Sequence, residues 1–175
     1  MRLAFLLSLS TVVYGQASHP VETSYDKAAN QTLFIASSPI HLQPSAEDRL
    51  AERRLRHPDD LHRFEVKYRC PGEASGCPNG NLVIKFSFCT SSWTFNTVQV
   101  GMTIDGKPIM LPPSMHPNSV LAAWVLDDAV SVELPVAAVR GLSADSEIQA
   151  TLGAYSYRLS RANLDTLRNV AERIR

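Results

Sequence analysis

Two cysteines, Cys70 and Cys77, lie in a loop of Pro, Gly and Ser residues, and their spacing limits the chemistry they can perform. A structural zinc site needs C-x2-C pairs or nearby histidines, so that four ligands reach one ion. A thioredoxin-type redox pair also needs C-x-x-C. Neither spacing occurs around Cys70 and Cys77, so we expect these two residues to form a structural disulfide.

A third cysteine, Cys89, is the other possible partner for Cys70. Segments 64–70 and 82–89 both alternate apolar and polar residues, and as an antiparallel hairpin they place Cys89 about 26 Å from the loop. A disulfide needs Cα atoms within about 7 Å. We therefore favour the Cys70–Cys77 bond, which contributes about 2–3 kcal/mol on the chain-entropy model, and expect Cys89 to be a buried free thiol. A different pairing and a metal or redox role are the alternatives.

Met110, Met115 and His116 lie close together in the sequence, and thioether and imidazole groups are ligands for Cu(I). The same residues also have a structural explanation. Met110 and Met102 fall at inward positions of predicted strands, and Met115 can fill a gap in a core. We favour packing for these side chains and keep a copper site at Met110, Met115 and His116 as the alternative.

Hydrolytic chemistry has few candidate residues. The chain contains no G-x-S-x-G, H-E-x-x-H or G-x-x-x-x-G-K-[ST] motif. His116 is the one histidine in the part of the sequence expected to form the folded body. The cluster HPDDLH at 57–62 contains residue types that bind metals; we favour Pro and acidic residues at a helix start as its explanation and keep a metal site as the alternative. We therefore expect a protein that is not an enzyme and that has no cofactor.

The N-terminal residues predict the compartment. Arg2 precedes an apolar run from Leu3 to Val13, and the small residues Gly15 and Ala17 follow it. This pattern is typical of a secretory signal peptide cleaved after Ala17, and the run is too short to cross a bilayer as a helix. We expect an exported protein, periplasmic or extracellular, in an oxidising compartment where disulfides persist.

Composition limits the number of domains and the class of partner. The chain has 17 basic and 17 acidic residues, so no strong electrostatic field attracts nucleic acid or an anionic membrane. About 160 residues remain after cleavage, which is enough for one domain with a core. We divide the chain into a signal peptide at 1–17, a polar leader with a short helix at 18–62, and a single β-rich domain at 63–175.

Hydrophobic periodicity predicts the elements that position these residues. The leader is expected to lend at most one strand, through TLFIA, and to form a polar helix at 45–58. Strands are predicted at 64–70, 82–89 and 98–104, followed by a tight turn at Asp105-Gly106 and an edge or short strand containing Pro108. A short helix at 136–140 and a strand pair hinged near Gly153 precede a C-terminal helix capped by Ser160.

The run SVLAAWVL at 119–126 is apolar on both alternations, which predicts a strand covered on both faces. Asp127 and Asp128 are expected to turn this strand into the next one at 129–134. Together these elements predict an α+β, mostly β fold: an antiparallel sheet or sandwich with a polar N-terminal helix and a packed C-terminal helix.

Three segments resemble known families. Residues 130–174 resemble the closing module of small exported bacterial envelope proteins, in which a strand, a short helix, a hairpin and a terminal helix follow one another. This likeness implies an envelope location and no catalytic residues. RRLR at 53–56 resembles the host-targeting motif of secreted oomycete effectors. YRC at 68–70, with LVIKF and IDGKPIML after it, resembles small periplasmic lysozyme inhibitors, whose β-barrels carry a disulfide.

The favoured function is a non-enzymatic binding or accessory module that contacts a protein or cell-envelope ligand through loops on a β scaffold. Trp93, Phe95 and the loop PPSMHPN at 112–118 are the candidate contacts, because an exposed Trp is a common binding anchor. The alternative for Trp93 is packing at the sheet edge. The alternatives are a copper carrier, an inhibitor of a cell-wall hydrolase and a secreted host-targeted effector.

Overall fold

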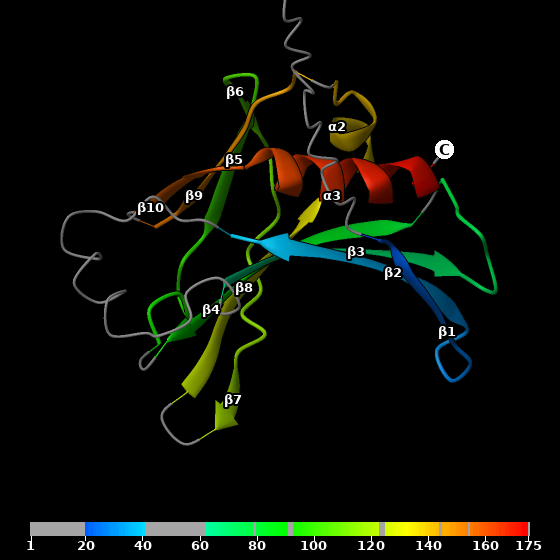
Figure 1. Ribbon diagram of the computed structural model, residues 1–175, viewed down its shortest axis with the longest axis horizontal. Coiled ribbons are helices and arrows are strands. Elements are labelled where there is room, and N and C mark those ends of the chain that lie inside the picture. Colours follow the sequence, from blue (N-terminus) through cyan, green and yellow to red (C-terminus); the bar gives the residue numbers. More distant parts are fainter. Residues whose placement is uncertain are drawn as a thin grey trace, which may run out of the picture.

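The computed structural model places two antiparallel sheets and a C-terminal helix around a shared apolar core (Figure 1). It describes residues 20–40, 62–78, 80–90, 93–122, 125–143, 145–153 and 155–174. The predicted signal peptide at 1–17 and the predicted polar helix at 45–58 lie outside the described residues. None of the helices in the described ranges is long and apolar enough to cross a membrane.

The larger sheet has six strands in the order β1-β2-β3-β4-β8-β7, and each neighbouring pair is antiparallel. Its strands are β1 (Glu22–Asp26), β2 (Gln31–Pro39), β3 (His62–Pro71), β4 (Asn81–Thr90), β8 (Val125–Leu134) and β7 (Ser119–Ala122). Along β3, Phe64 and Val66 are fully buried whereas Glu65 and Lys67 are only half-buried. The predicted alternation of this strand is therefore confirmed.

The smaller sheet has four strands in the order β10-β9-β5-β6. Its strands are β5 (Val100–Ile104), β6 (Lys107–Ile109), β9 (Ile148–Leu152) and β10 (Tyr155–Arg158). The turn between β5 and β6 has φ of 50° at Asp105 and 74° at Gly106, as the Asp-Gly pair predicted. Pro108 lies in β6, which is a short edge strand, and this prediction is also confirmed.

Helix α3 (Arg161–Ala171) lies across the inner face of the larger sheet at β2 and β3 and continues into the 3₁₀ helix η1 (Glu172–Ile174) (Figure 1). It buries Leu167 and Val170 in the core. The short helix α2 (Val136–Arg140) follows β8 and also contacts α3. The smaller sheet joins the same core through Tyr157 of β10, whose ring meets that of Phe86 of β4 edge-on at 6.3 Å. The predicted α+β, mostly β class with a packed C-terminal helix is confirmed.

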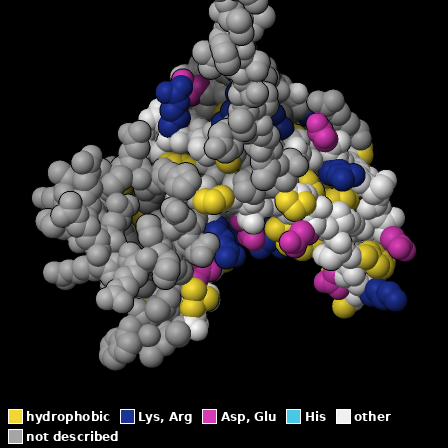
Figure 2. Space-filling model, viewed as in Figure 1, with side chains coloured by type: hydrophobic (Ala, Val, Ile, Leu, Met, Phe, Trp, Pro, Cys, Tyr) yellow, Lys and Arg dark blue, Asp and Glu magenta, His cyan; other side chains and the backbone are white. Residues whose placement is uncertain are grey.

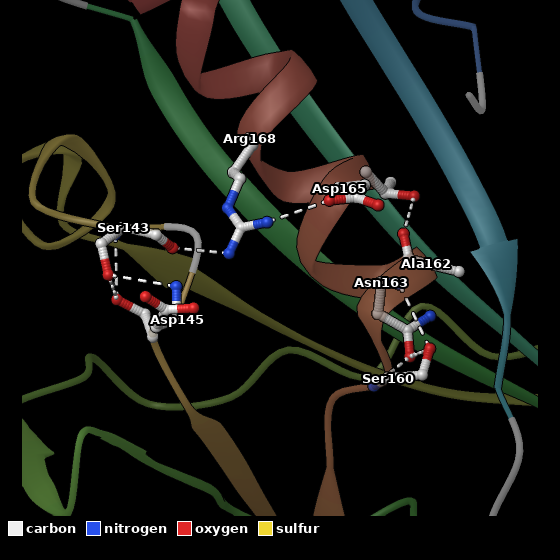
Figure 3. Close-up of polar contacts among 9 residues, drawn as sticks. Ser143, Asp145, Ser160, Ala162, Asn163, Asp165 and Arg168 are labelled. Atoms are coloured by element: carbon white, nitrogen blue, oxygen red, sulfur yellow. Dashed lines mark hydrogen bonds and ion pairs between the residues drawn. The ribbon is translucent and has the colours of Figure 1, made fainter. Parts of the chain in front are cut away.

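The start of α3 is fixed by a buried polar network (Figure 3). Ser160 accepts a hydrogen bond from the backbone N–H of Asn163, and the Asn163 side chain in turn accepts one from the backbone N–H of Ser160. The Asn163 amide also donates to the Ser38 hydroxyl and to the carbonyl of Pro39 in β2, at 2.8 and 2.9 Å. The capping residues of the helix thus also connect it to the sheet through hydrogen bonds.

The predicted leader contributes more to the sheet than expected. Residues 22–39 form two strands instead of at most one, and β2 pairs with β3 from Thr32 opposite Cys70 to Pro39 opposite Arg63. Phe34 and Ala36 of β2 are buried in the core. The run TLFIA has too few alternating residues to predict a strand of this length. The Ser-Ser-Pro that follows it is polar, and the burial of these residues depends on α3, which is distant in the sequence.

The turn expected at Asp127 and Asp128 was wrong. Both residues lie inside β8, and the chain reverses earlier, between β7 and β8. Neither aspartate is needed for a turn because each makes a tertiary contact: Asp127 pairs with Lys85 at 3.0 Å, and buried Asp128 accepts hydrogen bonds from a neighbouring loop. Nor is the preceding strand covered on both faces, since Val120 and Leu121 are exposed.

The Cys70–Cys77 disulfide is confirmed, with the two Cα atoms 5.8 Å apart. Its loop is held from several sides. Thr32 of β2 donates to the carbonyl of Gly72, the N–H of Cys77 donates to the carbonyl of Arg173, and the Tyr68 hydroxyl contacts the Cys77 sulfur at 3.3 Å. The loop therefore packs against the end of the C-terminal helix. Cys89 lies near the other end of β4, as predicted, and its side chain is outside the described part of the structure.

Candidate functional site

The two aromatic residues predicted to contact a partner differ in their surroundings. Trp93 is 40% exposed, whereas Phe95 is only 5% exposed. The Phe95 ring stacks on that of Phe88 with centroids 4.4 Å apart and also meets the ring of Tyr155 at 5.7 Å. Phe95 is therefore a core residue, and only Trp93 of this pair presents substantial surface to a partner. Residue type and sequence position could not separate these two roles.

Asp128 positions the segment that carries Trp93. Its carboxylate Oδ2 accepts hydrogen bonds from the backbone N–H groups of Thr94 and Phe95, the second at 2.9 Å. Asp128 itself is fully buried on β8. Because β8 residue Asp127 pairs with Ser119 of β7, this contact places the Trp93 segment at the same end of the larger sheet as β7.

The four edge strands of the two sheets differ in how they are protected. Edge strands expose unpaired peptide groups, and proteins commonly protect them with charged residues or proline. Three edges carry such residues, namely Glu22 and Asp26 in β1, Lys107 and Pro108 in β6, and Arg158 in β10. The fourth, β7, has the sequence SVLA and contains neither a charge nor a proline.

The β7 edge also exposes large apolar side chains. Val120 is 68% exposed and Leu121 is 58% exposed. Figure 1 shows β7 at the end of the larger sheet, projecting away from α3 and the smaller sheet. One protective feature is present, since the register with β8 is irregular between Val120 and Ala122. We define the β7 site as Val120 and Leu121 together with Trp93, whose segment Asp128 fixes at the same end of the larger sheet.

The loop before β7 holds the residues predicted as alternative copper ligands. Met110 is 91% exposed, so the prediction that it points inward was wrong; the strand β6 ends at Ile109 and leaves Met110 outside the sheet. Met115 is also exposed, and its backbone pairs with Ser131 of β8 through two hydrogen bonds of 2.8 Å. His116 is partly buried and its Nδ1 atom has no hydrogen-bond partner within the described ranges. A copper site here stays a prediction.

Among the described residues, no three His, Cys, Asp or Glu side chains come together as a metal site would require. A shallow depression of about 230 Å³ lies at the C-terminal end of β8, whereas β7 pairs with the N-terminal end of that strand. Its walls include Leu82, Leu134, Pro112 and Pro135, with Glu133 as the charged residue of the lining. This depression is separate from the β7 site.

The outer face of the larger sheet is a third surface, and it carries two ion pairs. Lys67 contacts Glu65 at 2.8 Å on β3, and Lys85 of β4 contacts Asp127 at 3.0 Å. Figure 2 shows Lys and Arg side chains beside Asp and Glu side chains along the hollow under the arched sheet. This face matches the aqueous strand face that the alternation predicted.

One sequence feature indicated the β7 site. Residues 117–126 contain no charge, which is unusual for a segment that lies at a sheet edge. The same feature also predicts a strand that is buried on both faces, because a central strand and an unprotected edge strand can have the same uncharged, apolar composition. Only the strand order distinguishes the two.

The fold and the site define a disulfide-bonded, two-sheet α+β protein with one uncharged, apolar edge strand. Comparison of the chain with protein-family models, with curated proteins and with solved structures finds no match.

Proposed function

We propose that this protein is an exported, non-enzymatic binding module that holds a partner polypeptide at the β7 site. The single observation that carries the proposal is the exposure of Val120 and Leu121 on β7, which alone among the edge strands of the described ranges has neither a charge nor a proline. Adjacent apolar side chains on such an edge lose contact with water when a partner covers them, and this burial favours association.

Trp93 supports the proposal as an anchor. Its backbone segment is fixed by Asp128 and by the stacking of Phe95 on Phe88, so little backbone entropy is lost when a partner covers the indole ring. Exposed Trp residues are frequent among the residues that dominate binding energy. The proposed contact therefore combines an exposed aromatic residue on a fixed segment with an exposed apolar strand.

Export is part of the proposal and is supported by the Cys70–Cys77 disulfide, since such bonds persist mainly in oxidising compartments. If it holds, N-terminal sequencing of material from the native host finds a chain that begins at Ser18 with the disulfide intact. A chain that begins at Met1 with both cysteines reduced would contradict it.

Site-specific photo-crosslinking tests the binding role. A photoreactive amino acid at position 120 should give covalent adducts of defined mass with a partner polypeptide in the native compartment. The same amino acid at position 23, an exposed residue of the β1 edge, is the matched control. Trp93→Ala should lower the yield from position 120, whereas Trp93→Phe should retain most of it. Equal yields from positions 120 and 23, or no adduct at either, would refute the proposed site.

A further inference from the structure

We propose that β7 binds its partner by strand addition, with an extended, uncharged segment of another protein pairing as a seventh strand of the larger sheet. This inference rests on the proposed function and names the mode of binding and the chemistry of the occupant. It concerns the backbone of β7 as well as the side chains of Val120 and Leu121.

The backbone of β7 leaves one side open for pairing. On its inner side β7 pairs with β8, from Ser119 opposite Asp127 to Ala122 opposite Val125. In the strand order of the described sheet, no strand follows β7 on the outer side. Peptide groups along such an edge are satisfied by water or by an added strand, and main-chain hydrogen bonds then supply affinity while side-chain contacts supply specificity.

The side chains determine which segment fits. An added strand would lie against Val120 and Leu121, which are apolar, and β7 has no charged residue to pair with a charge on the incoming strand. A Lys or Glu on the incoming strand would find no opposite charge on β7 and would cover less of the exposed apolar surface than an apolar residue does. The occupant is therefore an uncharged segment with apolar or β-branched residues, which also favour an extended conformation.

The length of the open edge favours a segment over a second copy of this chain. Pro117 has no N–H to donate, so the uninterrupted edge begins after it and continues through the four residues of β7. A stable interface between two folded copies usually buries at least about 1,000 Å². A strand of four residues with two exposed apolar side chains supplies much less than that, whereas a flexible segment needs only the edge itself in order to pair.

A peptide binding experiment tests strand addition directly. The probe is a blocked pentapeptide of alternating threonine and valine, and the control is the same peptide with proline at its centre, which cannot pair along its length. With isotope-labelled protein, the first peptide should shift the amide resonances of residues 119–122. At a peptide concentration ten times the dissociation constant, amide exchange of any β7 proton protected by the added strand should slow by about tenfold.

Two variants keep the test specific. Val120→Lys should weaken binding of the peptide at least tenfold, because the new ammonium group lies where an uncharged strand must pack. Thr23→Lys on the β1 edge is the matched control and should leave binding unchanged. Both positions are exposed, so both variants are expected to fold, and circular dichroism checks this.

Any of the following outcomes would overturn the inference. The proline peptide could bind as well as the parent, the shifts could map to β1 or β10, or sedimentation could show a dimer of the full chain that Val120→Lys dissociates. The last result would identify a second copy as the occupant. If photo-crosslinking from position 120 still captures a partner while the parent peptide does not bind, the proposed function stands and strand addition alone fails.

Discussion

The carboxylate of Asp128 on β8 accepts a hydrogen bond of 2.9 Å from the backbone N–H of Phe95, in the segment that leads away from β4. The same oxygen accepts a bond from the N–H of Thr94. Asp128 is fully buried and is directed to the core side of the sheet, whereas its neighbour Asp127 pairs with Lys85 on the other face. Adjacent residues of the same type thus have different structural roles.

This difference predicts unequal costs for removing the two carboxylates. Asp128→Ala should lower the free energy of unfolding by about 2–3 kcal/mol, because it leaves the buried N–H of Phe95 without an acceptor. Asp127→Ala removes a partly exposed ion pair and should cost about 1 kcal/mol or less. Urea denaturation of both variants measures the difference. Equal losses for the two variants would contradict the role assigned to Asp128.

The hydrogen-bond network at the start of α3 predicts unequal losses of stability for a second pair of substitutions. Ser160→Ala removes the N-cap acceptor and should cost about 1 kcal/mol. Asn163→Ala should cost about 3 kcal/mol, because it also removes the amide that donates to the buried Ser38 hydroxyl and to the carbonyl of Pro39. Denaturation midpoints compare the two variants. If Ser160→Ala lowers the free energy of unfolding as much as Asn163→Ala does, the hydrogen bonds from Asn163 to β2 add no stability beyond that of the helix cap.

The disulfide loop predicts a strong effect at Gly76. A Cβ atom added there would lie 2.4 Å from the carbonyl oxygen of Arg173, which is backbone and cannot move away cheaply. Gly76→Ala should therefore lower the free energy of unfolding by about 1–3 kcal/mol. Gly141→Ala is the matched control, because a Cβ there meets no atom within 4 Å. A neutral Gly76→Ala variant would show that the loop does not pack closely on η1.

Tyr68 predicts how stability changes in alkaline solution. Burial raises the pKa of the Tyr68 hydroxyl above its usual value of about 10, although the N–H of Gly80 and the charge of Arg140 act in the opposite direction. As the pH rises above 10, the unfolded chain therefore releases this proton before the folded chain does. The free energy of unfolding keeps its full value below pH 10 and decreases as the pH rises further. Absorbance titration should show that Tyr68→Phe removes one tyrosine from the late-titrating fraction. A late-titrating fraction that is unchanged in that variant would disprove the assignment.

The candidate site was only partly accessible from the sequence. Trp93 is exposed and its role as a partner contact stays a prediction, while Phe95 proved to be core and the predicted buried strand at 119–126 proved to include an exposed edge. The exposure of Trp93 against the burial of Phe95 depends on Asp128, which is 33 residues from Phe95 along the chain. No local pattern reports a contact over that separation.

Sequence alone determined the features that depend on neighbouring residues. Alternating apolar residues defined β3 and β4, the Asp105-Gly106 pair defined a turn that needs positive φ at both positions, and Ser160 marked the start of α3. The short spacing of Cys70 and Cys77 identified the disulfide. The tertiary structure alone decided that residues 22–39 join the sheet, that Asp127 and Asp128 lie within a strand, and that β7 is an edge. The physical reason is that backbone conformation is set over a few residues, whereas strand order and burial are set by pairings between distant segments.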